Sequence, residues 1–346
     1  MTPHFVDVGT LDVVALGESM VTFLPSRPGR LADVPSFERG IGGAESNVAC
    51  VLASAGHTAR WVGRVGADGF GDHLVEAIAA YGVDTSAVRR DPARPTGIYF
   101  RTAGDRATDA HEVAYYRAGS AASAMAVENV DLDTVRAGRV LHLSGITAAL
   151  SDDCLALMRE LTARRPGRPL VSFDVNHRPG LWRDTAGPHV LLDLARGADI
   201  VFVGEDEAEA AWEVTGGPAA LRAALPEPRA LVVKQGSRGA TLFDGDTVTF
   251  APALHTDVVA PVGAGDAFAA GFLSATLRGL PARDRLRHGH LMAAAALTVP
   301  GDLAEPPARD HADRLAALDE DAWGRLRLGP GWTEAVTRAD EEVRTP

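Results

Sequence analysis

Residues 261–271 read Pro-Val-Gly-Ala-Gly-Asp-Ala-Phe-Ala-Ala-Gly, a turn of small residues that leads into an alanine-rich helix predicted over 264–278. Small residues let backbone N–H groups approach an anion, and a helix N-terminus adds unpaired donors and the positive end of the helix dipole. A lone Asp in a first helical turn is usually a cap or a dipole partner. Beside an anion hole, the Asp266 carboxylate can instead take a proton from a hydroxyl while the N–H groups hold developing negative charge. This arrangement suits phosphoryl transfer without a P-loop.

Around this stretch, short apolar runs alternate with segments of helical periodicity. Strands are predicted at 12–17, 60–65, 139–143, 170–174, 199–203, 229–234, 239–243 and 247–250. Helices are predicted at 43–55, 70–81, 129–137, 152–164, 189–196, 205–215, 264–278 and 283–298. Because strands that alternate with helices form a mainly parallel sheet covered on both faces, the sequence predicts an α/β fold.

Two segments break this alternation. Residues 22–41 are rich in Pro and Gly, and residues 94–118 alternate polar and β-prone residues as half-buried strands do. We expect them to form a small β insertion against the main sheet, which could act as a lid. From about residue 306 the chain is charged and carries two Trp, with helices predicted at 310–318 and 333–343.

The composition is that of an acidic globular protein. The chain has 346 residues, and 34 Lys+Arg against 46 Asp+Glu give a formal net charge of −12. This balance argues against non-specific binding to nucleic acid or to an anionic membrane surface. Lys234 is the only lysine among the 34 basic residues, and it is followed by Gln235. The sequence therefore contains no Walker A loop, and any Schiff-base chemistry would have to use this one amine.

Several other classes of site are excluded. Cys50 and Cys154 are too few for a zinc cluster or a disulfide framework. No GxGxxG motif follows a predicted strand, which argues against a nicotinamide dehydrogenase. Residues 1–12 lack a basic start and an apolar core, and the most apolar stretches, 267–277 and 291–300, are too short to span a bilayer. We therefore expect a cytoplasmic protein.

A second motif, nearer the N-terminus, makes the pattern more specific. Residues 40–49 read Gly-Ile-Gly-Gly-Ala-Glu-Ser-Asn-Val-Ala, and residues 63–71 read Gly-Arg-Val-Gly-Ala-Asp-Gly-Phe-Gly. With the Gly-Ala-Gly-Asp run they resemble, in the same order, the two signatures of the ribokinase-like (PfkB) carbohydrate kinases. The resemblance covers about residues 12–305 and leaves 306–346 as a C-terminal helical tail.

This resemblance implies a three-layer α/β/α ribokinase-like fold with a small β-sheet lid, formed by the two segments named above. It also implies a phosphotransferase that uses ATP and Mg²⁺ to phosphorylate an alcohol group of a sugar. Asp266 would be the general base, and the backbone of Gly263, Ala264 and Gly265 would form the anion hole.

Four further segments resemble the 2-keto-3-deoxygluconate kinase branch of this family. They are residues 16–18, 114–123, 144–146 and 173–182. The likeness implies phosphorylation of the terminal hydroxyl to the 6-phosphate. A sugar acid carries a carboxylate, which the guanidinium groups of Arg117 and Arg178 could bind bidentately. The residues implied to contact the substrate are Gly42, Gly43, Asn47, Tyr99, Tyr115, Arg117 and Arg178.

The strand, turn and strand over residues 229–243 are implied to lie on the nucleotide side. Lys234, at the end of the first of these strands, could approach the phosphates or could serve the structure alone. The residues implied to contact ATP are Lys234, Gly236, Ser237, Gly239, Gly263, Gly265 and Ala294.

Two positions depart from the pattern of the family. Residues 260–262 read Ala-Pro-Val where the family commonly has Asp-Thr-x before the Gly-Ala-Gly-Asp run. Gly204 stands where an Asn-x-x-Glu motif has its Asn, while Glu207 remains to orient Mg²⁺ through water. Neither change removes the expected base or the anion hole, so we expect activity to survive.

Two alternatives stay open on the sequence. One is a fructokinase or another sugar kinase of the same family; an acid-specific site needs Arg117 and Arg178 to face the substrate rather than solvent. The other is a non-catalytic sugar-binding protein that has kept the fold. The only support for it is the departure from the family pattern at Ala260 and Gly204. The expected partners are ATP and a small-molecule sugar acid, not nucleic acid or membrane. Exposed edges of the lid favour a homo-oligomer, a dimer.

Overall fold

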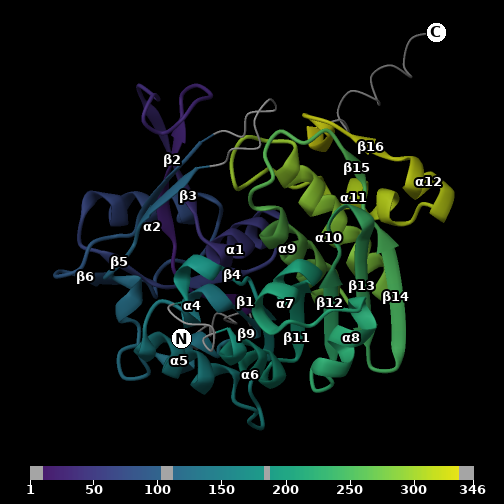
Figure 1. The fold of residues 1–346 in the computed structure, drawn as a ribbon, viewed down its shortest axis with the longest axis horizontal. Helices are drawn as coiled ribbons and strands as arrows, with labels where there is room; N and C mark the ends of the chain where they lie inside the picture. The colour runs from purple at the N-terminus through teal and green to yellow at the C-terminus, as the bar shows by residue number, and fades with distance from the viewer. Residues whose placement is uncertain (1–10, 103–111, 183–187, 335–346) are drawn as a thin grey trace, which may run out of the picture.

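The computed structural model describes residues 11–102, 112–182 and 188–334, and its centre is an eight-stranded sheet (Figure 1). The strand order is β14-β13-β12-β11-β10-β9-β1-β4. These strands are β1 (Leu11–Leu16), β4 (Ala59–Val62), β9 (Gly138–Ser144), β10 (Leu170–Asp174), β11 (Ile200–Gly204), β12 (Ala230–Lys234), β13 (Gly239–Asp244) and β14 (Thr247–Pro252). The strands from β4 to β12 pair in parallel, and β13 and β14 pair antiparallel at one edge. The prediction of a mainly parallel sheet in an α/β fold is confirmed.

Helices cover both faces of this sheet (Figure 1). On one face α1, α9 and α10 pack around an apolar cluster that includes Val48 and Phe272. On the other face α5 to α8 pack around a cluster that includes Leu157 and Leu194. The bounds are α1 (Ala44–Ser54), α5 (Asp152–Thr162), α6 (His189–Gly197), α7 (Glu205–Trp212), α8 (Gly217–Ala224), α9 (Ala264–Leu277) and α10 (Ala282–Leu297). A sheet with two buried faces needs this double cover, so the fold has three layers.

A separate four-stranded sheet has the order β3-β2-β7-β8 (Figure 1). Its strands are β2 (Met20–Pro25), β3 (Phe37–Gly42), β7 (Ile98–Arg101) and β8 (Val113–Tyr116). The register aligns Thr22, Tyr99 and Tyr115 across three strands, and so on one face. The rings of Phe23 and Phe100 stack on the opposite face with their centroids 4.6 Å apart. The two segments expected to form a lid therefore build a sheet of their own, and its action as a lid stays a prediction.

Gly63 divides a strand that the sequence predicts as continuous. β4 stays in the main sheet, whereas β5 (Arg64–Gly66) pairs with β6 (Arg89–Asp91) in a small sheet. A Cβ atom at Gly63 would lie 2.6 Å from the ring of Trp61 and 3.0 Å from the carbonyl oxygen of Gly17. Because only glycine tolerates such a close approach, the chain can leave the main sheet here.

The sequence analysis misses several short elements. Helix α8 was not predicted: its N-cap Gly216 and its first residue Gly217 both have positive φ, and a Gly-Gly-Pro sequence is typical of a loop. Also missed are α4 (Gly145–Ala148) and three 3₁₀ turns, η1 (Ala122–Ala124), η2 (Pro179–Leu181) and η3 (Gly236–Arg238). In contrast, α2 (Gly69–Ala80) agrees with the helix predicted at 70–81, and α3 (Leu132–Val135) is shorter than the helix predicted at 129–137.

The C-terminal part folds back onto the main body. Helix α11 (Arg309–Ala316) agrees with the helix predicted at 310–318, whereas α12 (Glu320–Arg325) was not predicted. A short strand, β16 (Arg327–Leu328), pairs in parallel with β15 (His255–Thr256), and a 3₁₀ turn, η4 (Trp332–Glu334), follows. The helix predicted at 333–343 lies outside the described residues from 335 onward. Nowhere in the described ranges does a helix have the length and apolar character that crossing a bilayer requires.

Candidate active site

A cavity of about 810 Å³ opens at the carboxyl ends of β10, β11 and β12, where α/β sheets bind ligands. Side chains of the four-stranded sheet line its other side. The cavity brings together most of the residues that the sequence singles out, although they come from distant parts of the chain. Those that line it are Gly42, Gly43, Asn47, Tyr99, Tyr115, Arg117, Arg178, Glu207, Lys234, Gly263, Ala264, Gly265 and Asp266.

The N-terminus of α9 forms one wall of the cavity. Gly263 is its N-cap and adopts the left-handed conformation with a φ of 71°. A Cβ atom at Gly263 would overlap the carbonyl oxygen of Asp302, so both its conformation and its surroundings require glycine. The N–H groups that follow, at Ala264 and Gly265, have no partner in the first turn of a helix and are available to an anion.

Asp266 stands in the first turn of α9 beside these donors. Nδ2 of the buried Asn47, from α1, donates to Oδ2 of Asp266 at 2.8 Å. Oδ1 of Asp266 accepts no hydrogen bond from the described residues, so it is available to a hydroxyl in the cavity. Burial raises the pKa of Asp266 to about 7; the Asn47 bond opposes the shift, and Asp174 and Asp302 add to it. A carboxyl group with this pKa is matched to general base catalysis near neutral pH.

We expect kcat/KM to rise with pH through about 7, because Asp266 must be ionised to accept a proton and its pKa is raised to that value. Below the midpoint the slope should be about tenfold per pH unit, with a plateau above it. Replacing Asn47 by Ala should move the midpoint upward, since the amide donates to the ionised form. A pH–rate profile of both proteins checks this, and a midpoint near 4 in the wild type would contradict it.

The single lysine lies next to the N-terminus of α9. Nζ of Lys234, at the end of β12, is 3.1 Å from each carboxylate oxygen of Asp174, at the end of β10. Burial alone would lower the pKa of Lys234, but the carboxylates of Asp174 and Glu207 raise it above its ordinary value, so the amine stays charged. A Cβ atom at Gly265 would lie 3.8 Å from Nζ, which places the ammonium beside the turn that would hold a phosphoryl group.

The two arginines expected to bind a carboxylate differ in how available they are. Arg117 is nearly buried and forms an ion pair with Glu18, which also accepts from the hydroxyl of Ser120. The side chain of Arg178 is 51% exposed, and its Nη1 is 3.9 Å from Oε1 of Glu207. Both line the cavity, so neither simply faces bulk solvent. Among the described residues, Arg178 donates one hydrogen bond, from Nη1 to the carbonyl oxygen of His177 at 3.2 Å, which leaves its Nε and Nη2 for a ligand. On Arg117 the buried Nε is without a hydrogen-bond partner among those residues.

Asp302 and its partners are site residues that the sequence analysis missed. Oδ2 of Asp302 accepts from the hydroxyl of Tyr99 at 3.0 Å, and Oδ1 accepts from Nη2 of Arg101 at 3.1 Å. Burial raises the pKa of Asp302, while Arg101 and Tyr99 oppose the shift. A Cβ atom at Gly42 would overlap the Tyr99 hydroxyl, so the glycine makes room for this cluster. The only sequence signal was a polar Asp in the loop after α10.

Glu45 lies inside the N-terminal motif and holds α1 in place. Its Oε1 accepts from the hydroxyls of Ser144 and Thr147, each at 2.8 Å. Burial raises the pKa of Glu45, and the two hydroxyl donors oppose the shift. A Cβ atom at Gly17 would overlap this carboxyl group. Glu45 therefore ties α1, which carries Asn47, to the end of β9.

The other residues expected to contact ATP lie outside the cavity. Gly236 begins the 3₁₀ turn η3 and Gly239 follows it, with φ values of 57° and 140°, and Ser237 lies within that turn. Ala294 is buried in an apolar cluster with Trp323. These four remain predictions, whereas Lys234, Gly263 and Gly265 lie in the cavity itself.

The carboxylates of the cavity fit a cation that arrives with phosphates rather than one held by protein alone. In the described part of the chain, no three His, Cys, Asp or Glu side chains gather as a metal site. Oε2 of Glu207 accepts from the N–H of Gly204 at 2.8 Å and so caps α7. Its Oε1 faces Arg178. Glu207 and Asp174 could hold the waters of a Mg²⁺ bound to phosphate oxygens.

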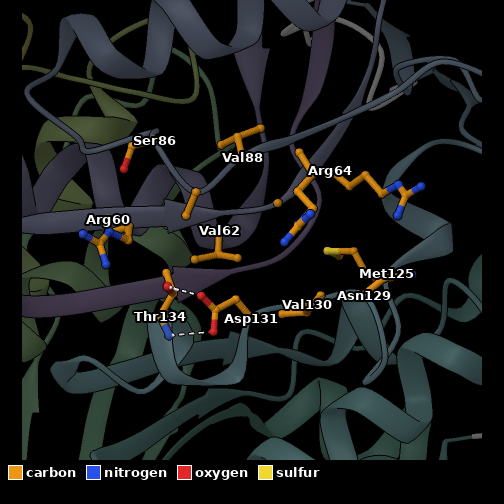
Figure 2. A pocket seen from close by; sticks show the side chains of 13 residues that line it. Arg60, Val62, Arg64, Ser86, Val88, Met125, Asn129, Val130, Asp131 and Thr134 are labelled. Atoms are coloured by element: carbon orange, nitrogen blue, oxygen red, sulfur yellow. Dashed lines mark hydrogen bonds between the residues drawn. The ribbon is translucent and has the colours of Figure 1, made fainter.

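A second cavity, of about 440 Å³, shares no lining residue with the first (Figure 2). Two of its arginines are already paired: Nε of Arg60 lies 2.7 Å from Asp84, and Nη2 of Arg64 lies 2.9 Å from Asp91. Figure 2 shows these two guanidinium groups apart from each other, not converging on one point. The residues with chemistry to perform therefore lie in the first cavity.

Comparisons with known proteins agree with this geometry. The family model described as pfkB family carbohydrate kinase matches residues 10–309. The chain is 36% identical over 310 residues to a 2-dehydro-3-deoxygluconokinase of Bacillus subtilis (strain 168), covering 87% of this chain and 94% of that protein. The crystal structure of the Thermotoga maritima 2-dehydro-3-deoxygluconokinase is 25% identical with a TM-score of 0.80, covering 89% of this chain and 98% of that one. The crystal structure of an uncharacterized sugar kinase from Pyrococcus horikoshii in complex with ATP is 25% identical with a TM-score of 0.75. The match covers 91% of this chain and 100% of that one.

Proposed function

The chain belongs to the pfkB family of carbohydrate kinases, phosphotransferases with an alcohol group as acceptor, and from that premise we propose that it phosphorylates 2-keto-3-deoxygluconate at its terminal hydroxyl. ATP is the donor and the product is the 6-phosphate. One observation carries the proposal: a single cavity holds Asp266 above an anion hole and also holds the guanidinium of Arg178, which has donors free for a carboxylate. The relatives named as 2-dehydro-3-deoxygluconokinases support the same substrate.

The reacting groups follow from the contacts of Asp266. Its ionised carboxylate takes the proton of the terminal hydroxyl as the hydroxyl oxygen forms a bond to the γ-phosphorus of ATP. The bond from that phosphorus to the β,γ-bridging oxygen breaks, and ADP leaves with the electron pair. Asn47 keeps Oδ2 of the carboxylate engaged, so Oδ1 is the oxygen presented to the hydroxyl. The base lies in the turn that binds the phosphoryl group, so both reactants are held close together.

Negative charge builds on the phosphoryl oxygens during transfer, and the cavity supplies positive groups for it. The backbone N–H groups of Ala264 and Gly265 lie at the positive end of the α9 dipole. Lys234 adds a full charge beside the same turn. Mg²⁺ bound to the phosphates would neutralise further charge, with Asp174 and Glu207 positioned to hold its waters.

The substrate side of the cavity is polar and well supplied with hydrogen-bonding groups. Arg178 reaches a carboxylate with charge-assisted hydrogen bonds. The Tyr99 hydroxyl donates to Asp302, so the oxygens of these two residues are the atoms that can accept hydrogen bonds from the hydroxyls of the sugar chain. Tyr115 lies beside Tyr99, with ring centroids 5.4 Å apart, and provides an apolar wall.

A neutral-sugar kinase is the second candidate, and one observation favours it. Glu18 pairs with Arg117, so this arginine brings little net charge to a substrate carboxylate. Acid specificity then depends on Arg178, which is half exposed. A non-catalytic sugar-binding protein has less support, because Asp266, Lys234 and the first residues of α9 line one cavity.

Steady-state assays of ADP production with a panel of sugars test the proposal. We expect kcat/KM for 2-keto-3-deoxygluconate to exceed that for fructose and ribose by about a hundredfold, the worth of a charged carboxylate contact. Reactions without sugar give the background rate of ATP hydrolysis. Equal or faster turnover of fructose or ribose would assign the protein to the neutral-sugar kinases, and no sugar-dependent ADP would favour the binding protein.

A further inference from the structure

Residues 318–334, here called the strap, lie beyond the family match, which ends at residue 309. The strap comprises α12, β16 and η4; it packs against α10 and pairs with β15 (Figure 1). Trp323 and Trp332 are buried, in one apolar cluster with Ala294 of α10. The strap is therefore an integral part of the fold.

The strap holds both ends of the turn that follows β14. Nε1 of Trp323 donates to the carbonyl oxygen of Pro252 at 3.0 Å. Further along, β16 pairs with β15, and the N–H of Asp257 donates to the carbonyl oxygen of Leu328 at 2.9 Å. These contacts fix the chain from Pro252 to Asp257 from the outside.

Residues 253–262 connect this turn to the anion hole and have few anchors of their own. The N–H of Val259 donates to the carbonyl oxygen of Leu297, at the end of α10, at 2.8 Å. Among the described residues, the one side-chain hydrogen bond made by this loop runs from Thr256 to the carbonyl oxygen of Leu254, within the loop itself. Val259 is 46% exposed. The N–H of Ala253 also donates to the carbonyl oxygen of Arg238 at 3.3 Å, so the position of the loop depends on α10, on the strap and on this one bond to η3.

We propose that the strap positions this loop for the phosphate donor, with Trp323 and Leu328 as positioning residues for ATP. The inference rests on the kinase function proposed above. Its physical basis is that the loop runs directly into Pro261 and Gly263, which line the cavity and begin the anion hole. Most residues on the sugar side come from β3, β7, β8, α1 and the segments after β8 and β10, none of which pairs with the strap; Asp302, in the loop after α10, is the exception.

The contacts of Arg287 with the strap limit the variants that can test this proposal. Its guanidinium is fully buried over the ring of Trp323, 4.6 Å from the centroid. It also donates to the carbonyl oxygen of Ala316 at 2.9 Å and to Glu320 at 2.9 Å. Cutting off the strap would remove Glu320 and the Trp323 ring and leave this buried charge with Ala316 as its remaining partner, which could unfold the protein. A conservative change at Trp323 avoids this problem.

The test compares Trp323→Phe with Trp332→Phe. The first keeps an aromatic ring beneath Arg287 but removes the donor to Pro252. The second makes the same chemical change in the same cluster, at an indole whose Nε1 has no hydrogen-bond partner among the described residues. Calorimetry measures the Kd of each variant for a non-hydrolysable ATP analogue and for 2-keto-3-deoxygluconate, and hydrogen exchange follows the amides of residues 255–260.

We expect Trp323→Phe to raise the Kd for the ATP analogue at least about twofold, the effect of one lost hydrogen bond, and to leave the Kd for the sugar acid unchanged. Amides of residues 255–260 should exchange faster in Trp323→Phe alone. A smaller change in nucleotide Kd, an equal rise for both ligands, or the same effects in Trp332→Phe would overturn the proposal. If the wild-type protein binds both ligands but catalyses no phosphoryl transfer, the proposed kinase reaction is wrong. The comparison of Kd values still tests the role of the strap.

Discussion

Replacing Asp266 by Asn is expected to lower kcat by about a thousandfold, the usual contribution of a positioned general base. The amide is nearly the same size as the carboxylate and can still accept the hydrogen bond from Asn47, so the geometry of the site should survive. What it cannot do is take the proton of the attacking hydroxyl. The KM values for ATP and sugar should therefore change only a few-fold, because the loss falls on the transition state.

A matched control is Asp91→Asn, the same chemical change at another carboxylate with low solvent exposure. Asp91 pairs with Arg64 and accepts from the backbone N–H groups of Ala93 and Arg94, and it does not line the first cavity. This variant should lose stability but keep a nearly normal kcat. Steady-state kinetics and thermal unfolding of both variants separate the two effects. Turnover of Asp266→Asn within tenfold of the wild type would remove Asp266 from the role of base.

The sequence carries enough information to predict the main sheet, because that sheet is built by local patterns. Apolar runs such as 170–174 and 229–234 alternate with helical segments, and buried parallel strands have this appearance. The glycines of the two motifs also carry direct structural meaning. Gly263 needs a left-handed conformation and Gly42 must leave room for the Tyr99 hydroxyl. Such requirements restrict the residue type at one position, so they are visible in a single sequence.

The partners of the site residues could not be predicted in the same way. The pairs of Arg117 with Glu18, of Arg101 with Asp302 and of Lys234 with Asp174 join residues that are 60 or more positions apart, and no local pattern marks them. The chain has 33 arginines among its 34 basic residues, so an Arg in a motif is weak evidence of a ligand contact. Only the fold shows which guanidinium groups have a close carboxylate partner and which one, Arg178 at 3.9 Å from Glu207, is paired more loosely.

This difference in pairing makes Arg178 the residue with the largest expected effect on substrate choice. Replacing Arg178 by Gln should raise the KM for 2-keto-3-deoxygluconate by about 10- to 150-fold, which corresponds to the 1.5–3 kcal/mol of a hydrogen bond to a charged group. The kcat should fall less, because the carboxylate lies at the opposite end of the substrate from the reacting hydroxyl. Turnover of fructose, which has no carboxylate, should stay within a few-fold of its wild-type value.

Arg196→Gln provides the control for Arg178→Gln, because Arg196 has a similar exposure of 42% but lies on α6 and pairs with Asp193. It should leave both substrates unaffected. If Arg178→Gln instead weakened sugar acid and fructose equally, the guanidinium would be acting through Glu207, 3.9 Å away, on the phosphate side of the site. In that case the charge of Arg117 would have to recognise the carboxylate in spite of its ion pair with Glu18. Since separating a nearly buried ion pair costs several kcal/mol, a site built in that way would bind sugar acids poorly, and the neutral-sugar assignment would gain the support that the acid assignment lost.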